Sequence, residues 1–413
     1  MSASQVSPGR CDRIRIFDTT LRDGEQAAGV CFHAEDKVEI ARRLDALHVD
    51  VIEAGFPASS RVEAEAVAAV AQAVKDARVC ALARAVPGDV EAALAALRSA
   101  VAPRIHLFVN SSDMHLAHQL HRTHEQVMAM TEALVGQARR HCDDVEFSPM
   151  DATRADPAFL AALVGVAIAA GAGTINLPDT VGAATPDQVA QMFRGLRAAQ
   201  PKVEEIVLSF HGHDDLGMAT GNSLAAVMAG ARQVEVSVNG LGERAGNTAF
   251  EEFVAALYVH GQRLGVATGV EGSGIYALAK QVAERSGVFV PPNKAVVGGN
   301  AFRHASGIHQ DGVLKHRETY EVLDPQWIGH PVGSEIVLGK LSGRTGFARR
   351  VAELGFALEG EALAEAFRRF QALAAERREV GREELSALCA GVVGAGSRAG
   401  AAGCRAPGYS LDL

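Results

Sequence analysis

Two histidines separated by a single glycine, His211 and His213, are the sharpest chemical signal in the chain. In a β-strand, residues two apart point to the same face, so both imidazoles can bind one ion. Neutral imidazole is a common ligand of divalent first-row metals. With the carboxylate of Asp23 and the amide oxygen of Asn247, the set suits Mg²⁺, Mn²⁺ or Zn²⁺ and leaves coordination positions open. For an isolated pair of histidines, an incidental polar strand end is the alternative.

The residue directly before Asp23 is Arg22, whose guanidinium can stabilise a developing enolate or alkoxide near the metal. A structural ion pair with Glu53 or Glu243 is an open alternative for this arginine. A metal ion at this place can polarise the ketone of a chelating 2-oxo carboxylate. The group therefore predicts carbonyl chemistry at a metal centre.

Three further polar residues are candidates for binding the substrate. Ser148 and Thr180 can donate hydrogen bonds to a carboxylate, and helix N-caps are the alternative for both. His106 lies within a predicted strand, where a core histidine with satisfied hydrogen bonds is the alternative.

A second polar group lies further along the chain. His309 and Asp311 can supply a base for a proton alpha to a thioester carbonyl, although a solvated loop is an equally open interpretation. The stretch Gly339–Arg344 is rich in backbone donors and cations, and it can receive the phosphates of a CoA-like ligand. It lacks the Walker spacing, so ATP is not implied. The candidate residues for contacting the phosphates are Gly339, Lys340, Ser342, Gly343 and Arg344.

The elements that must position these residues follow one rhythm. Short apolar runs recur about every 25 to 40 residues, each followed by a helical stretch, as expected for a parallel sheet covered by helices. The eight predicted strands are Ile14–Phe17, Val49–Phe56, Arg78–Ala83, Arg104–Asn110, Asp144–Ser148, Thr174–Leu177, Ile206–His211 and Gln233–Val238. Eight such units fit an α/β (β/α)₈ TIM barrel better than an open doubly wound sheet.

Polar residues fall in phase with these strands. In a (β/α)₈ barrel the chemistry lies at the C-terminal ends of the strands, in the loops that lead to the helices. Asp18–Glu25 follow the first strand, His211–Asp215 the seventh and Asn239–Asn247 the eighth. Around a closed barrel the first, seventh and eighth strands are neighbours, so the predicted metal ligands come together.

Composition excludes several other classes of protein. The 413 residues are 48% hydrophobic and 22% charged, which supports a sizeable core. The net charge is -9 and no long basic run occurs, which argues against nucleic-acid and membrane-surface binding. No apolar stretch is long enough for a transmembrane helix, and residues 1–13 lack the apolar segment of a secretory signal. Six scattered cysteines without a CxxC pair indicate reduced thiols in a cytoplasmic protein.

The rhythm of strands and helices ends near Gly287. We therefore predict a catalytic barrel over residues 13–286 and a smaller, mainly helical C-terminal region over residues 287–390 that completes the active site. Two helices are expected between Thr345 and Ala390, separated near Gly355–Gly360. Residues 391–413 are rich in Gly, Ala and Ser, which predicts a disordered tail.

Four long motifs, in order, resemble the 2-isopropylmalate synthase and homocitrate synthase family. The motifs are Phe17–Gln26, His211–Gly217, Asn239–Asn247 and Ser306–Gly312. The resemblance runs from about residue 13 to 345, and it implies condensation of acetyl-CoA with a small 2-oxo acid, followed by thioester hydrolysis. Within the family, Cys80–Arg84 and Asn222–Ala226 are closer to the isopropylmalate branch.

The family roles carry over position by position. The resemblance implies that Arg22 and Thr180 hold the 2-oxo acid, and that His309 deprotonates the acetyl methyl group, with Asp311 and Tyr320 nearby. It also implies a homodimer, because family members use the region beyond the barrel to complete the partner's site. The implied metal ligands are Asp23, His211, His213 and Asn247. The substrate-binding candidates are Arg22, His106, Ser148, Met150 and Thr180.

Two departures from the family pattern bear on the substrate. Only about 70 residues follow the last motif, so a leucine-binding regulatory domain, and feedback by leucine, are not expected. Met150 stands where family members carry Glu near the 2-oxo acid, which removes a negative charge and adds flexible apolar bulk. Our hypothesis is a specialised enzyme for a pyruvate with an anionic 3-substituent, such as a phosphonate or phosphinate in antibiotic biosynthesis. The alternatives are an unregulated 2-isopropylmalate synthase, a homocitrate synthase or, in another class, a metal-dependent lyase or aldolase.

Overall fold

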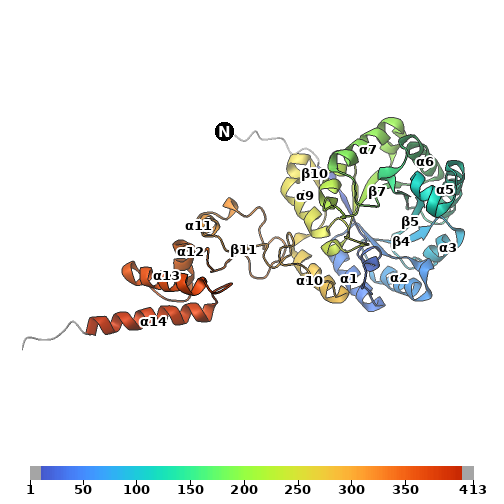
Figure 1. The fold of residues 1–413 in the computed structure, drawn as a ribbon. Coiled ribbons are helices and arrows are strands. Elements are labelled where there is room, and N and C mark those ends of the chain that lie inside the picture. Colours follow the sequence, from blue (N-terminus) through green and yellow to red (C-terminus); the bar gives the residue numbers. More distant parts are fainter. Residues whose placement is uncertain (1–10, 402–413) are drawn as a thin grey trace, which may run out of the picture. The chain divides into compact units, whose positions relative to one another are not determined.

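Eight parallel strands close into a barrel in the computed structural model, which describes residues 11–401 (Figure 1). In barrel order they are β2 (Arg15–Asp18), β3 (Val51–Gly55), β4 (Arg78–Arg84), β5 (Pro103–Asn110), β6 (Val145–Met150), β7 (Thr174–Asp179), β8 (Val207–Gly212) and β9 (Gln233–Val236). β9 pairs with β2 and closes the ring. The predicted (β/α)₈ fold is confirmed, and every strand begins and ends within two residues of its predicted bounds.

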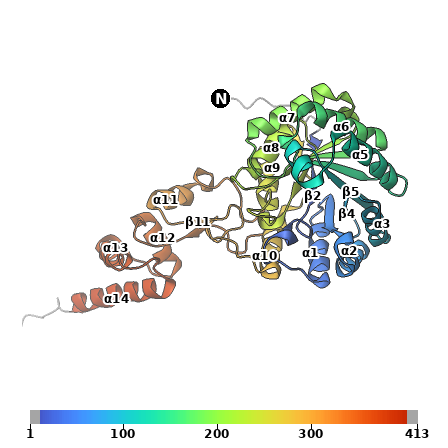
Figure 2. The same ribbon diagram turned by 45° about the vertical axis from the view of Figure 1, so that its right-hand side comes forward.

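Helices surround the barrel (Figures 1 and 2). They are α1 (Ala34–Ala46), α2 (Arg61–Ala73), α3 (Pro87–Ala96), α5 (His124–Arg139), α6 (Pro157–Ala170), α7 (Pro186–Ala199), α8 (Ala219–Met228), α9 (Phe250–Leu264) and α10 (Ile275–Ser286), with the short α4 (Asp113–His115) after β5. α6 and α7 begin with proline behind the N-caps Asp156 and Thr185, whose side chains accept from backbone N–H groups of the first turn. This capping fixes where each loop ends, and therefore how much chain remains at the mouth of the barrel.

The interior of the barrel contains a polar layer around Arg104. Its guanidinium donates to Glu146 at 2.8 Å and to Gln233 at 2.7 Å, and only 1% of its side chain is exposed. Gln233 also donates to the second oxygen of Glu146 and to Ser209. A buried arginine is stable only where hydrogen bonds and charges compensate its desolvation, so these four strands are held in register.

The chain divides into two compact units, and the first extends to Gly298 and includes Trp327–His330. It therefore continues beyond residue 286, where the sequence predicts the boundary. The reason is packing: Trp327 stacks on Tyr258 of α9 at 3.9 Å, and Tyr276 of α10 donates its backbone N–H to the carbonyl of Ile328. Among the described residues, no helix has the length and hydropathy to cross a membrane.

The second unit contains a two-stranded parallel pair and four helices in its described residues. These are β11 (Arg303–His304), α11 (Gly307–Lys315), β12 (Glu335–Ile336), α12 (Arg344–Glu353), α13 (Gly360–Ala374) and α14 (Arg382–Ala401). The prediction of two helices after Thr345 is wrong, because the chain breaks again between α13 and α14. α14 also continues to Ala401, through part of the tail predicted to be disordered from residue 391; residues 402–413 lie outside the described residues.

A buried lysine ties the loop after β2 to the wall of the barrel. The ammonium group of Lys37 on α1 lies 2.6 Å from Glu25 and 2.8 Å from Glu63, and its side chain is fully buried. Lys37→Met should lower the free energy of unfolding by about 3 kcal/mol, because it leaves two largely buried carboxylates without a cation.

Urea unfolding followed by circular dichroism measures this effect. Arg61→Ala is the control, since it removes an ion pair with Glu65 that is exposed to solvent and therefore contributes little to stability. Equal and small losses for both variants would contradict the role given to Lys37.

Candidate active site

A cavity of about 250 Å³ opens at the C-terminal ends of the barrel strands. Its lining contains both polar and apolar side chains. The residues are Arg22, Asp23, Gln26, Leu82, His106, Phe108, Ser148, Met150, Asn176, Pro178, Thr180, His211, His213, Glu235, Glu243 and Arg244. The structure thus brings together the barrel residues that the sequence singles out, with Asn247 on the adjoining loop.

Three of the predicted metal ligands converge on one point. Nε2 of His211 lies 3.1 Å from Nε2 of His213, and these two atoms lie 3.4 and 3.9 Å from one carboxylate oxygen of Asp23. Both side-chain polar atoms of Asn247 are buried and have no hydrogen-bond partner. Gly242 allows this approach, because a Cβ atom there would lie 2.6 Å from the amide nitrogen of Asn247. Two imidazoles, a carboxylate and an unsatisfied amide oxygen fit a divalent cation.

The protonation states suit metal binding. Burial, followed by the neighbouring charge of His211, lowers the pKa of His213 to about 3, so its ring nitrogen is free to bind an ion at neutral pH. Burial alone would raise the pKa of Asp23, but the charges of Arg22 and His211 outweigh it and lower the pKa to about 2. Nδ1 of His211 lies 2.7 Å from Glu235, which directs Nε2 toward the ion.

A buried chain of hydrogen bonds links Arg22 to Ser148, a candidate residue for binding the substrate. Arg22 donates to Glu53 at 2.6 Å, and the other oxygen of Glu53 lies 2.8 Å from Nδ1 of His106. Nε2 of His106 is 2.7 Å from the hydroxyl of Ser148, which also accepts from Asn176. The structure therefore shows the ion pair of Arg22 and the satisfied hydrogen bonds of His106, and it places both side chains in the cavity lining. Although burial opposes it, the charge of Glu53 raises the pKa of His106.

The turn after β6 holds Met150 and Thr180 in place. Asp151 has a positive φ of 70°, and its backbone N–H donates to the hydroxyl of Thr180 at 2.9 Å. Its buried carboxylate binds the hydroxyl of Ser112 and the guanidinium of Arg154. Met150 is half-buried at the end of β6 and lines the cavity. Neither Ser148 nor Thr180 is a helix N-cap, which removes that alternative.

The remaining predicted residues lie in the second unit. His309 and Tyr320 stack with ring centroids 3.9 Å apart. Asp311 pairs with Lys315 at 2.6 Å, so the predicted His309–Asp311 pair is wrong: Lys315 lies one helical turn away and takes the carboxylate.

In the predicted phosphate-binding stretch, Lys340 and Arg344 are exposed, whereas Ser342 is buried and its hydroxyl accepts from the backbone N–H of Gly339. Ser342 therefore shapes the loop from within. Gly343 is the N-cap of α12, directly before Arg344, so the backbone N–H groups of the first helical turn lie beside this cation.

The cavity lining also contains residues that the sequence does not single out, among them Asn176, Glu235 and Arg244. Asn176 and Glu235 lie within strands β7 and β9, and their polarity is the only feature of the sequence that indicates a place in the cavity. Arg244 belongs to the Asn239–Asn247 motif, has a positive φ of 59°, and binds Asp215 and the carbonyl of Thr180.

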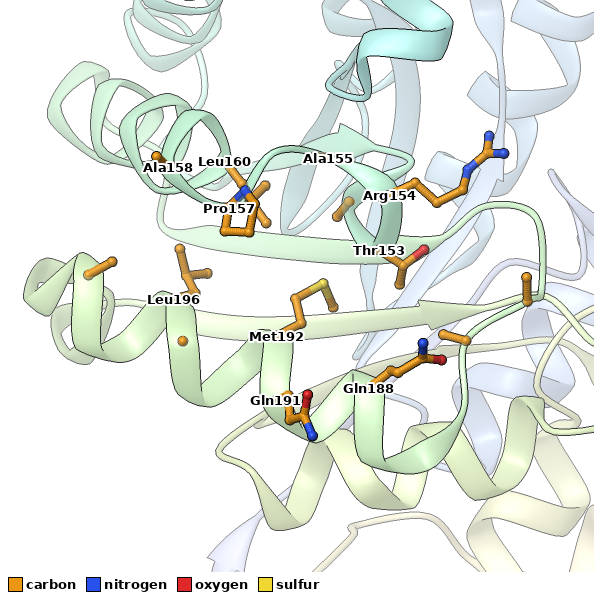
Figure 3. A pocket seen from close by; sticks show the side chains of 15 residues that line it. Thr153, Arg154, Ala155, Pro157, Ala158, Leu160, Gln188, Gln191, Met192 and Leu196 are labelled. Carbon is orange, nitrogen blue, oxygen red and sulfur yellow. The ribbon is translucent and has the colours of Figure 1, made fainter.

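A larger cavity, of about 610 Å³, lies elsewhere. Figure 3 shows Pro157 and Leu160 of α6 opposite Met192 and Leu196 of α7 on the outside of the barrel. None of the metal-binding side chains lines this groove, so size alone does not locate the site.

Comparison with known proteins agrees with this geometry. Residues 13–282 match the HMGL-like family, and residues 296–378 match the homocitrate synthase post-HMGL domain-like family. The 2-isopropylmalate synthase of Carboxydothermus hydrogenoformans is 50% identical over 91% of this chain and 74% of the relative. The chain belongs to the 2-isopropylmalate synthase family. The family's enzyme from Pyrococcus furiosus is 48% identical over 93% of this chain and 77% of its own length.

Solved structures share the fold at lower identity. Hydroxymethylglutaryl-CoA lyase from Pseudomonas aeruginosa is 23% identical, with a TM-score of 0.54 over 67% of this chain and 92% of the lyase. An HMG-CoA lyase from Acinetobacter baumannii, in complex with coenzyme A and 3-methylmalate, is 20% identical, with a TM-score of 0.56 over 70% and 95%. As a member of the 2-isopropylmalate synthase family, the chain is an acyl-CoA-dependent transferase.

Loss of one imidazole should weaken metal binding in this family member. His213→Ala is expected to lower the affinity for Mn²⁺ by roughly 100-fold or more, since even supporting residues of metal sites contribute 10- to 100-fold. Isothermal titration calorimetry of chelator-treated protein measures the affinity. The control is His141→Ala, an exposed histidine remote from the cavity lining. Unchanged affinity in His213→Ala would exclude this cluster as the metal site.

Proposed function

We propose that the protein is a 2-isopropylmalate synthase that condenses acetyl-CoA with 2-oxoisovalerate to give 2-isopropylmalate and CoA. The observation that carries this proposal is that the cavity lining contains both polar and apolar side chains. The metal cluster and its polar neighbours line the cavity, and Leu82, Phe108 and Met150 contribute apolar surface to it. A 2-oxo acid with a branched alkyl group needs both, because its carboxylate and ketone are polar and its isopropyl group is not. Relatives named 2-isopropylmalate synthase at 47–50% identity support the assignment.

The polar residues of the cavity have defined tasks in this reaction. A divalent cation held by Asp23, His211, His213 and Asn247 would polarise the ketone. Arg22, fixed by Glu53, places a permanent positive charge beside the carbonyl oxygen as it becomes an alkoxide. Thr180 accepts from the backbone at Asp151, so its hydroxyl hydrogen remains to donate to the substrate carboxylate.

The second unit supplies the base in this proposal. His309, stacked on Tyr320, takes a proton from the acetyl methyl group, and the resulting enolate carbon attacks the ketone. Water then cleaves the thioester and releases CoA. The exposed cations Lys340 and Arg344, at the start of α12, are the proposed contacts of the CoA phosphates.

We also propose a cytoplasmic homodimer in which a partner covers the apolar surface of the second unit. Seven large apolar side chains among the described residues of that unit are more than one third exposed, which is unusual for a free surface. They are Ile308, Leu314, Tyr320, Val322, Val332, Leu341 and Val393.

A second candidate substrate is a pyruvate with an anionic 3-substituent, such as a phosphonate. The observation that favours it is Met150, which lies in the cavity where the family pattern has Glu. The absence of a carboxylate there removes repulsion against a second anionic group.

A panel of 2-oxo acids tests the two candidates. With acetyl-CoA and Mn²⁺ or Mg²⁺, thiol release should be fastest with 2-oxoisovalerate and slower with 2-oxoglutarate and phosphonopyruvate. A clear preference for phosphonopyruvate would replace the first candidate by the second. No CoA release with any 2-oxo acid would favour a lyase.

The variant Met150→Glu tests how the apolar side chain at position 150 affects the choice of substrate. It should change kcat/KM for 2-oxoisovalerate by less than about tenfold, and lower kcat/KM for anionic 2-oxo acids by about tenfold or more, since like charges in a poorly solvated site cost at least about 1.4 kcal/mol. Met150→Gln has nearly the same shape without the charge and is the matched control. Equal effects of Glu and Gln would show that shape, rather than charge, governs selection at this position.

A further inference from the structure

The neighbours of His309 and Tyr320 are both tied to one residue, His304 of β11. Gln310, next to His309 on α11, donates its side-chain amide to the backbone carbonyl of His304 at 2.9 Å. The carboxylate of Glu321, next to Tyr320, forms a hydrogen bond with Nε2 of His304 at 2.8 Å. The backbone and the imidazole of His304 therefore hold the two segments that carry the stacked pair.

Glu321 is a buried clamp. Its side chain is 4% exposed, and besides His304 it accepts from Arg317 at 2.9 Å and from Ser334 at 2.8 Å. Although burial alone would raise the pKa of Glu321, these three partners outweigh it, so the pKa is lowered and the carboxylate stays ionised. A charged group with partners from three segments fixes the position of the residue that precedes it, Tyr320.

Gln310 anchors the helix on the other side. Its amide also reaches the carbonyl of Val337 at 2.8 Å and the hydroxyl of Ser342 at 3.1 Å. One buried side chain therefore joins α11, the strand pair and the loop Gly339–Arg344. This bonding fixes the position and rotation of the helical turn from which His309 projects.

Gly312 provides the slot for the tyrosine ring. A Cβ atom at this position would lie 2.5 Å from Cε2 of Tyr320, so any side chain would push the ring away from α11. The backbone of Gly312 on one side and the hydrogen bonds of Glu321 on the other restrict the position of Tyr320, and in this position its ring stacks on His309.

We propose that His304 and Glu321 are positioning residues: together they hold the His309–Tyr320 pair in the geometry needed to take the proton from the acyl group. The inference rests on the proposed function, because it assigns a task to the same base. His304 and Glu321 act through His309 and Tyr320, and their effect is on the rate of proton removal rather than on the binding of the 2-oxo acid.

Two pairs of variants test the inference in the full-length enzyme loaded with Mn²⁺. Glu321→Gln keeps the shape of the clamp but removes its charge, and Glu318→Gln is the control, an exposed glutamate on the same loop. His304→Gln retains a nitrogen donor near the position of Nε2, whereas His304→Leu removes the donor. Thermal unfolding of each variant establishes that it is folded.

The readout is the split between kinetic constants. In Glu321→Gln and His304→Leu, kcat should fall by roughly 10- to 100-fold, the range expected for a misplaced catalytic group, while KM for the 2-oxo acid stays within about twofold. The deuterium isotope effect on kcat with trideuterated acetyl-CoA should rise, since proton removal becomes slower. His304→Gln should recover most of the activity, and Glu318→Gln should behave as wild type.

Outcomes that overturn the inference differ from those that overturn the function. If the wild type releases CoA but Glu321→Gln matches Glu318→Gln, the inference is wrong and the proposed function stands. A fall in kcat with an unchanged isotope effect also overturns it, because that pattern indicates fewer folded molecules or a different slow step. If the wild type releases no CoA with any 2-oxo acid, the proposed function fails and the inference fails with it.

Discussion

The structure of the active site depends on how buried carboxylates are neutralised inside a closed barrel. Asp23, Glu53 and Glu235 lie in one connected network, and Arg22 is the guanidinium that joins it. Carboxylates outnumber the guanidinium in this network. Burial of uncompensated negative charge is costly, so the network favours the binding of a cation. Burial lowers the pKa of His211, but the charge of Glu235 outweighs it, so the pKa is raised.

The barrel meets this constraint with rigid supports at the strand ends. Asp151 adopts a positive φ, which a non-glycine residue rarely does, and its bonds to Ser112 and Thr180 hold the turn. In the loop after β9, Gly242 leaves room for the side chain of Asn247, whose buried amide has no hydrogen-bond partner within the protein. Ligands held this way have little freedom left to lose when the metal binds, which favours affinity and a fixed geometry.

Much of this arrangement follows from the sequence, and the remainder could not. The alternation of apolar runs and helices determines eight strands to within two residues, because a parallel barrel strand must be apolar nearly throughout. The paired histidines were visible because strand periodicity puts both on one face. Glu235 and Asn176 could not be identified from the sequence, because their places in the cavity depend on which strands become neighbours and on the register between them. Asp311 was given the wrong partner because sequence spacing alone cannot choose between His309 and Lys315.

The division of labour within the cavity explains how one family can serve several substrates. In the proposed reaction, Arg22 and the metal ligands act on the ketone and the carboxylate, which every 2-oxo acid possesses, so these residues cannot distinguish one acid from another. The substituent on the third carbon meets other residues, and Leu82, Phe108 and Met150 are the apolar ones in this cavity. A hydrophobic pocket discriminates weakly between alkyl groups, but a single buried charge discriminates strongly. Residue 150 can therefore change substrate choice without disturbing the chemistry, because the turn that carries it is fixed by Asp151 and not by its own side chain.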